Sequence, residues 1–171
     1  MEIKNKMQEI EIEKMVLNCG GVEDKLEKSI KLLEIISKKK IQIIKSSKRI
    51  PDFGISPGKK SGCKVTLRNK EEIVGLLKRF FAAMDNSVLK RQIADNHASF
   101  GIREYIEIPG LEYNRDIGMI GLEFDVSFKR KGKRVKYKKI KKGKYPARQT
   151  VTKEEIVEFL KKNFKINIRQ K

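Results

Sequence analysis

Apolar and polar residues follow two different periods along the chain, and these periods divide it into predicted elements. A period of two, which is typical of a half-buried strand, occurs in residues 8–18, 63–68 and 122–129. A period near 3.6, which is typical of an amphipathic helix, covers residues 22–37 and a segment that begins at Asn69. The pattern therefore interleaves strands with helices.

Less regular patterns complete the prediction. Residues 38–45 form a short strand, 98–108 a strand with a glycine irregularity, and 109–121 a glycine-punctuated loop. Thr152 and Glu155 have the spacing of a capping box that opens a last helix. Because no regular strand–helix–strand repeat occurs, we predict an α+β fold: a mostly antiparallel sheet with helices packed on one face, plus a basic extension.

Charge divides the chain further. It carries 41 Lys and Arg against 22 Asp and Glu, a net charge of +19 at pH 7, and such a field attracts polyanions. Residues 129–148 hold 12 basic side chains and no acidic one. We therefore predict three parts: a core over 1–128, a basic extension over 129–148, and a C-terminal helix over 149–171 that packs on the core. The basic residues of the extension are Lys129, Arg130, Lys131, Lys133, Arg134, Lys136, Lys138, Lys139, Lys141, Lys142, Lys144 and Arg148.

The basic segment has the composition of a solvated tail, since runs of like charge repel one another. Two features argue against a simple tail. A helix signal follows it, so both of its ends are tethered, and apolar or aromatic residues are spaced through it: Val135, Tyr137, Ile140 and Tyr145. These anchors are few for its length, so we expect the segment to be largely disordered in the free protein.

Nucleic acid is the partner that the charge favours. Binding to an anionic membrane usually needs an amphipathic helix with exposed apolar anchors, and no segment shows one clearly, so we expect no membrane contact. The N-terminal residues have no apolar region of the kind found in signal peptides. Cys19 and Cys63 lack metal-ligand spacing and are expected to be reduced thiols in the cytosol.

Motifs for catalysis are weak. A phosphate-binding loop of an NTPase needs G-x-x-x-x-G-K-[ST] between a strand and a helix. Residues 54–62 contain a Gly-Lys pair, but they miss this spacing and precede a strand. His97 is the single histidine, and no nucleophile stands in a recognisable context. Paired-acid catalysis stays open, but no feature of the sequence selects a pair of carboxylates. We therefore predict that the protein is not an enzyme and has no cofactor or metal site.

The strand over residues 63–68 offers groups that bind RNA. Alternation places Lys64, Thr66 and Arg68 on one face of it. An ordinary solvated strand face has the same composition, so the residues alone leave both interpretations open. With no Trp and 7% aromatic residues, recognition of folded RNA by its shape and phosphates fits better than stacking on single strands.

Five blocks stand in the order found in one known family. They are IEKMVLNCGG (12–21), RIPDFGISPGKKSGCKVTLR (49–68), SFGIREYIEIPG (99–110), YNRDIGMIGLEFDV (113–126) and VTKEEIVEFLKKNF (151–164). Through these blocks the chain resembles the large-subunit ribosomal protein five family, the universal proteins that bind 5S rRNA, in its archaeal form. The resemblance covers nearly the whole chain.

The resemblance implies a structural constituent of the large ribosomal subunit in the central protuberance. Its partners would be 5S rRNA, large-subunit rRNA, P-site tRNA, small-subunit ribosomal protein thirteen and neighbouring central-protuberance proteins. The expected 5S rRNA-binding residues are Asn18, Lys39, Lys64, Thr66 and Arg68. The expected tRNA-proximal loop is Ser47, Lys48, Arg49, Ile50, Pro51, Asp52, Phe53, Gly54, Ile55 and Ser56. The expected bridge to the small subunit is Tyr113, Asn114, Arg115 and Asp116, and the basic extension would run along rRNA.

Some positions depart from the family pattern. Residues 38–41 read Lys-Lys-Lys-Ile where the family usually has Gly-Gln-Lys-Pro, and Ser56 and Ser61 replace an Arg and an apolar residue. The alternatives to a ribosomal constituent are a free RNA chaperone or assembly factor, and a free-standing nucleic-acid enzyme or its accessory subunit.

Overall fold

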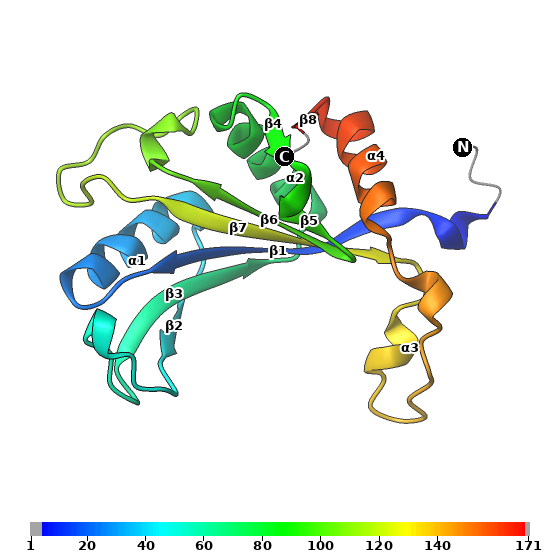
Figure 1. Ribbon diagram of the computed structural model, residues 1–171, viewed down its shortest axis with the longest axis horizontal. Helices are drawn as coiled ribbons and strands as arrows, with labels where there is room; N and C mark the ends of the chain where they lie inside the picture. The colour runs from blue at the N-terminus through cyan, green and yellow to red at the C-terminus, as the bar shows by residue number, and fades with distance from the viewer. Residues whose placement is uncertain (1–4, 170–171) are drawn as a thin grey trace.

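Six strands form one sheet in the computed structural model, which describes residues 5–169. Their order is β2-β3-β1-β7-β6-β5, and every neighbouring pair is antiparallel (Figure 1). The strands are β1 (Ile10–Gly20), β2 (Gln42–Lys45), β3 (Lys60–Leu67), β5 (Ile93–Ala94), β6 (His97–Ile102) and β7 (Leu122–Arg130). A separate parallel pair joins β4 (Ser87–Leu89) to β8 (Asn167–Arg169). The predicted α+β class with a mostly antiparallel sheet is confirmed.

Three helices pack on one face of this sheet. They are α1 (Asp24–Ser37), α2 (Lys70–Ala83) and α4 (Lys153–Phe164), whereas the one-turn helix α3 (Arg134–Tyr137) lies on the opposite side (Figure 1). Asn69 begins α2 by accepting a hydrogen bond from the Glu71 N–H at 3.3 Å. The predicted capping box of Thr152 and Glu155 is present at the start of α4 and satisfies N–H groups that a helix leaves without partners.

A cluster of phenylalanines fills the space between the helices and the sheet. The ring of Phe81 on α2 lies 5.4 Å from Phe100 on β6 and 6.0 Å from Phe124 on β7, measured between centroids. It also lies 5.4 Å from Phe164 on α4. Tilted and edge-to-face rings at these distances attract one another beyond the area they bury. One side chain therefore joins both later helices to the middle of the sheet.

The structure corrects three details of the sequence prediction. β1 continues beyond residue 18, where the predicted strand ends, because Cys19 and Gly20 pair with Cys63 and Gly62 of β3. The strand predicted over 98–108 ends at Ile102, and the chain then turns inward to bury Tyr105. The residue pattern does not predict the short strands β4, β5 and β8, since each owes its conformation to a partner strand.

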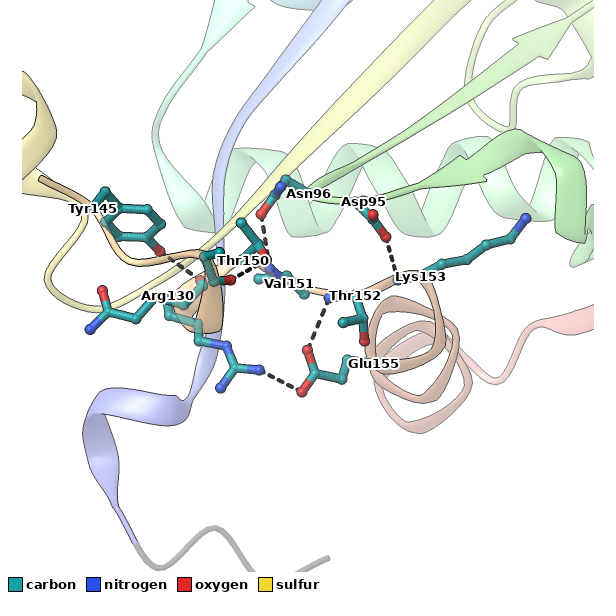
Figure 2. Close-up of polar contacts among 11 residues, drawn as sticks. Asp95, Asn96, Arg130, Tyr145, Thr150, Val151, Thr152, Lys153 and Glu155 are labelled. Atoms are coloured by element: carbon teal, nitrogen blue, oxygen red, sulfur yellow. Dashed lines mark hydrogen bonds and ion pairs between the residues drawn. The ribbon is translucent and has the colours of Figure 1, made fainter.

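The turn between β5 and β6 holds the start of α4 in place (Figure 2). Asn96 has φ +64°, and its Oδ1 accepts a hydrogen bond from the buried Val151 N–H at 2.9 Å. Its own N–H donates to the Val151 carbonyl at 3.0 Å, and Asp95 Oδ1 accepts from the Lys153 N–H at 3.1 Å. A left-handed backbone suits Asn better than most residues with a side chain. This turn therefore fixes the point where the chain returns from the basic extension.

Glu155 supports the same junction. Burial alone would raise its pKa, but hydrogen bonds from the Arg130 guanidinium at 2.5 Å and the Thr152 N–H at 3.0 Å hold the pKa below its usual value. Figure 2 shows the carboxylate between these two donors. The last residue of β7 and the first turn of α4 are thus joined by a charged pair.

Replacing Asn96 by Ala removes the acceptor for the buried Val151 N–H and adds backbone strain. We expect Asn96→Ala to lower the free energy of unfolding by about 2–3 kcal/mol. Asn96→Asp keeps both the acceptor and the tolerance for positive φ, so its loss should be clearly smaller. Urea unfolding followed by circular dichroism measures both, and equal midpoints for the two variants would contradict this role of the side chain.

Candidate nucleic-acid interface

The face of the sheet turned away from α1, α2 and α4 is polar, and we call it the open face. Cross-strand register orders its residues in rows that run from β2 toward β6. One row holds Gln42, Lys64, Asn18 and Glu123, and the next holds Thr66, Val16, Asp125 and Ser99. Residues between these positions point into the core, as the buried Cys63, Val65 and Leu67 do.

Three of the five expected 5S rRNA-binding residues meet on the open face. Asn18 lies directly opposite Lys64, and Thr66 follows in the next row with its side chain exposed. Arg68 lies one residue beyond the end of β3 and is also exposed. These groups offer an amide, a hydroxyl and two cations within one short stretch of sheet, which suits contacts to RNA phosphates and sugars.

Lys39 lies elsewhere, in the turn between α1 and β2. It forms an ion pair with Glu72 in the first turn of α2, and this hydrogen bond holds the pKa of the Glu72 carboxyl below its usual value. The pair joins α1 to α2, and any contact of Lys39 with RNA would compete with Glu72.

The open face also contains residues that sequence reasoning missed. Gln42 lies beside Lys64 and adds an amide to the basic side of the face. Glu123 and Asp125 line β7 on the other side of β1 and repel phosphate. The alternation of 122–129 indicated that these two acids share a face, but the strand order that sets them beside Asn18 is a tertiary feature. These acids therefore favour contact of a phosphate backbone with the part of the open face formed by β3 and β1, which we call its β3 half.

Two loops project on the side of the open face, from opposite ends of the sheet (Figure 1). One is the expected tRNA-proximal loop between β2 and β3. In it Ile50 and Ile55 exchange backbone hydrogen bonds of 2.9 and 3.1 Å around a turn at Pro51–Phe53. Ile55 is buried, whereas Phe53 has 71% of its surface exposed. Exposed Lys48 and Arg49 precede this turn.

The same loop is anchored to the start of α1. Lys59 Nζ lies 2.8 Å from Glu23 Oε1 and 3.3 Å from the Gly54 carbonyl. The hydrogen bond from Lys59 holds the pKa of the Glu23 carboxyl below its usual value. Close approach of the strands below it also demands glycine, since a Cβ on Gly62 would lie 3.1 Å from the Cys19 carbonyl oxygen.

The expected small-subunit bridge lies in the loop between β6 and β7, beside α1. The Asn114 N–H donates to the Tyr105 hydroxyl at 2.8 Å, and Asn114 Oδ1 accepts from the Asp116 N–H at 2.9 Å. Tyr113 and Arg115 are exposed on either side. The buried Tyr105 thus positions a loop whose remaining side chains face outward.

The other projecting segment is the basic extension, and three ion pairs fasten its base. Lys131 Nζ lies 2.6 Å from Glu9, and Lys133 Nζ lies 2.6 Å from Glu13. Burial works to lower the pKa of Lys133, but Glu13 outweighs it and raises the pKa above its usual value. With Arg130 bound to Glu155, three of the twelve expected rRNA-contacting cations already have carboxylate partners. Lys129 is half-buried, and eight are exposed: Arg134, Lys136, Lys138, Lys139, Lys141, Lys142, Lys144 and Arg148.

The two cysteines face each other across β1 and β3 in the core. Burial raises the pKa of the Cys19 thiol to about 12 and that of Cys63 to about 11, so both thiols are protonated at neutral pH. Across residues 5–169, no cluster of three or more His, Cys, Asp and Glu side chains is placed to bind a metal ion. In the same part of the chain, no helix combines the length and apolar character needed to span a membrane.

A family model and several archaeal proteins that are similar to this chain all point to the same ribosomal protein family. The model for the C-terminus of the large-subunit ribosomal protein five family (uL5) matches residues 60–159. A large ribosomal subunit protein uL5 from Methanosphaera stadtmanae is 36% identical over 167 residues, which cover 96% of this chain and 99% of that protein. The uL5 proteins of Nanoarchaeum equitans and Sulfolobus acidocaldarius are 35% and 36% identical, over 97% and 96% of this chain and 99% and 94% of their own lengths.

Protease sensitivity of the free protein tests the expectation of disorder in the extension. Between Lys138 and Lys144 the lysine side chains are exposed. A backbone hydrogen bond from the Gly143 N–H to the Val135 carbonyl holds this part of the chain to α3. We therefore expect limited trypsin to cleave first between Lys138 and Lys144, as mass spectrometry of the fragments would show. The exposed Lys28 and Lys31 lie within the helix α1, serve as internal controls and should be cut later. Resistance of 138–144 at times when α1 is cut would contradict the expectation.

Proposed function

The chain belongs to the uL5 family of ribosomal proteins, as its sequence blocks predicted, and from this premise we propose that it attaches 5S rRNA to the large-subunit rRNA in the central protuberance. Family membership itself establishes the general role. The protein is a structural, non-enzymatic constituent of the large subunit of cytoplasmic ribosomes, where it contacts rRNA.

The open face carries the proposal for 5S rRNA. Asn18, Lys64 and Thr66 share its β3 half, and Arg68 follows at the edge. The acids of β7 limit phosphate contact to that half, so an RNA helix would lie along β3 and β1. Shape, phosphates and 2′-hydroxyls are what proteins read on such a helix.

The loops carry the proposals for the other partners. Lys48 and Arg49 lie in the loop between β2 and β3, where they would meet the phosphates of P-site tRNA. The loop with Tyr113–Asp116 would contact small-subunit ribosomal protein thirteen. This second loop projects on the helical side of the sheet, away from the open face, so its contact is compatible with bound 5S rRNA (Figure 1).

The proposed division into parts follows the same logic. The core over 1–128 binds 5S rRNA, the extension over 129–148 runs along large-subunit rRNA, and residues 149–171 close the fold by packing α4 on the core. Ile156 and Leu160 of α4 are fully buried in the same core cluster as Met15 of β1, which supports a shared core on both sides of the extension.

Binding of 5S rRNA should depend on the open face and on salt. We expect Arg68→Ala to weaken binding about tenfold and Thr66→Val about threefold, because each removes one contact to the RNA. The log–log salt slope of the wild type should lie at roughly −4 to −8 if about six to ten phosphates are neutralised. Arg68→Ala should make this slope shallower by about 0.7–0.9, whereas Thr66→Val should leave it unchanged. Fluorescence anisotropy with labelled 5S rRNA measures both quantities.

Lys28→Ala is the matched control for that experiment. It removes one exposed charge from α1, on the helical side of the sheet, and should leave the affinity within about twofold. All three variants should keep the wild-type melting transition in circular dichroism. Equal weakening by Lys28→Ala and Arg68→Ala, or equal affinity of the wild type for unrelated RNA, would remove the specific claim for 5S rRNA.

Co-sedimentation separates a ribosomal constituent from an RNA chaperone or assembly factor. We expect the protein to remain with large subunits through a sucrose gradient at high salt, because several surfaces hold it at once. A chaperone or assembly factor would instead migrate with precursor particles or at the top of the gradient.

A further inference from the structure

The basic extension exposes apolar surface that its charge does not explain. Tyr137 has 62% of its surface exposed and Ile140 78%, and both lie among lysines in the middle of the segment. Val135, by contrast, is partly covered by the returning chain, since a Cβ on Gly143 would lie 2.5 Å from Val135 Cγ1. A lysine-rich segment that only neutralised phosphates would have no need of a large exposed ring.

The chain that leads into Tyr137 is tied to the sheet. The turn of α3 begins directly after Lys133, whose ammonium is held by Glu13 with both side chains 17% exposed. Lys133 Nζ also lies 5.9 Å from the centroid of the Tyr137 ring, within the range of a cation–π contact. These two contacts restrict where the ring can lie relative to the sheet, which reduces the entropy lost when a ligand covers it.

The charge around the ring indicates what covers it. Arg134, Lys136 and Lys138 flank it in sequence and are exposed, so the occupant of this surface carries negative charge close to a flat apolar group. An unpaired nucleotide has both features, because its base stacks on an aromatic ring while its phosphates meet neighbouring cations. A basic aromatic segment can also enter an anionic membrane surface, but α3 is a single turn and offers no long amphipathic face.

We propose that Tyr137 is a stacking platform for one unpaired RNA base, with Lys136 and Lys138 on the adjacent phosphates. The proposal rests on the proposed function in that the RNA is ribosomal. It goes further in assigning to the extension the recognition of a bulged or looped-out nucleotide in addition to phosphate binding.

Affinity for two matched RNA hairpins tests the platform. They share one stem, and one of them carries a single bulged adenine. The full-length wild type should bind the bulged hairpin about tenfold more tightly, Tyr137→Phe should keep this preference, and Tyr137→Ala should abolish it. Tyr137→Ala should leave the log–log salt slope unchanged, whereas Lys138→Ala should make it shallower by about 0.7–0.9. An equal preference in the wild type and Tyr137→Ala overturns the proposal.

Fluorescence supplies an independent readout, because the chain contains no Trp. Tyr137→Trp makes the single indole of the protein, and stacking should quench its emission with the bulged hairpin but not with the paired one. Tyr113→Trp is the matched control, since Tyr113 is similarly exposed at 56% but lies in the loop before β7. Equal quenching of both indoles overturns the proposal. So does a blue shift of the Tyr137→Trp emission with phosphatidylserine vesicles in the absence of quenching by RNA.

The two failures remain distinguishable. Binding of 5S rRNA through Arg68 and Thr66, and co-sedimentation with large subunits, do not depend on Tyr137. If those results hold while the hairpin preference is absent, the stacking platform fails and the ribosomal function stands.

Discussion

Phe81 of α2 packs against aromatic rings of β6, β7 and α4, and this packing helps to bury one face of the sheet while the other face stays open. Because the helices and the aromatic cluster bury one face, each strand must place its apolar residues at every second position toward them. The opposite residues are then free of packing demands. Asn18, Lys64 and Thr66 owe their common surface to this constraint, since shifting β3 by one residue would turn Cys63, Val65 and Leu67 toward solvent and the cations toward the core.

Part of the excess positive charge is neutralised by carboxylates at the places where segments of the fold meet. Carboxylates pair with lysines where segments join: Glu72 with Lys39 between two helices, Glu23 with Lys59 under the β2–β3 loop, and Glu13 with Lys133 at the base of the extension. Exposed pairs add little stability each. Their larger effect is to separate cations that position the chain from cations that remain available to phosphate.

Much of this architecture can be predicted from the sequence because the periods are clear. The long strands, the three helices and the inward residues of β3 follow from alternation and capping, and Thr152 and Glu155 identify the start of α4. The short strands β4, β5 and β8 and the inward turn at Tyr105 could not be predicted, since contacts between distant segments create them.

The same division holds for the candidate site. Alternation within one strand is enough to predict that Lys64 and Thr66 share a surface. That Glu123 and Asp125 border this surface can be recognised only once the strand order is known. Nothing in the residue pattern indicates that Lys39, Lys131 and Lys133 already have acidic partners, because those partners lie far away in the chain.

Because the extension is fastened at both ends, the distance that it can reach from the sheet is limited. Before the extension Arg130 forms an ion pair with Glu155, and after it Val151 is hydrogen-bonded to Asn96. The chain between these two contacts is therefore a closed loop. A free tail of the length of 129–148 would span about 70 Å when fully extended, but a loop with its ends together reaches about 35 Å. The lysines of the loop are thereby confined to a small volume around the open face. RNA held by β3 would meet them at a high local concentration, and RNA farther away would lie beyond their reach.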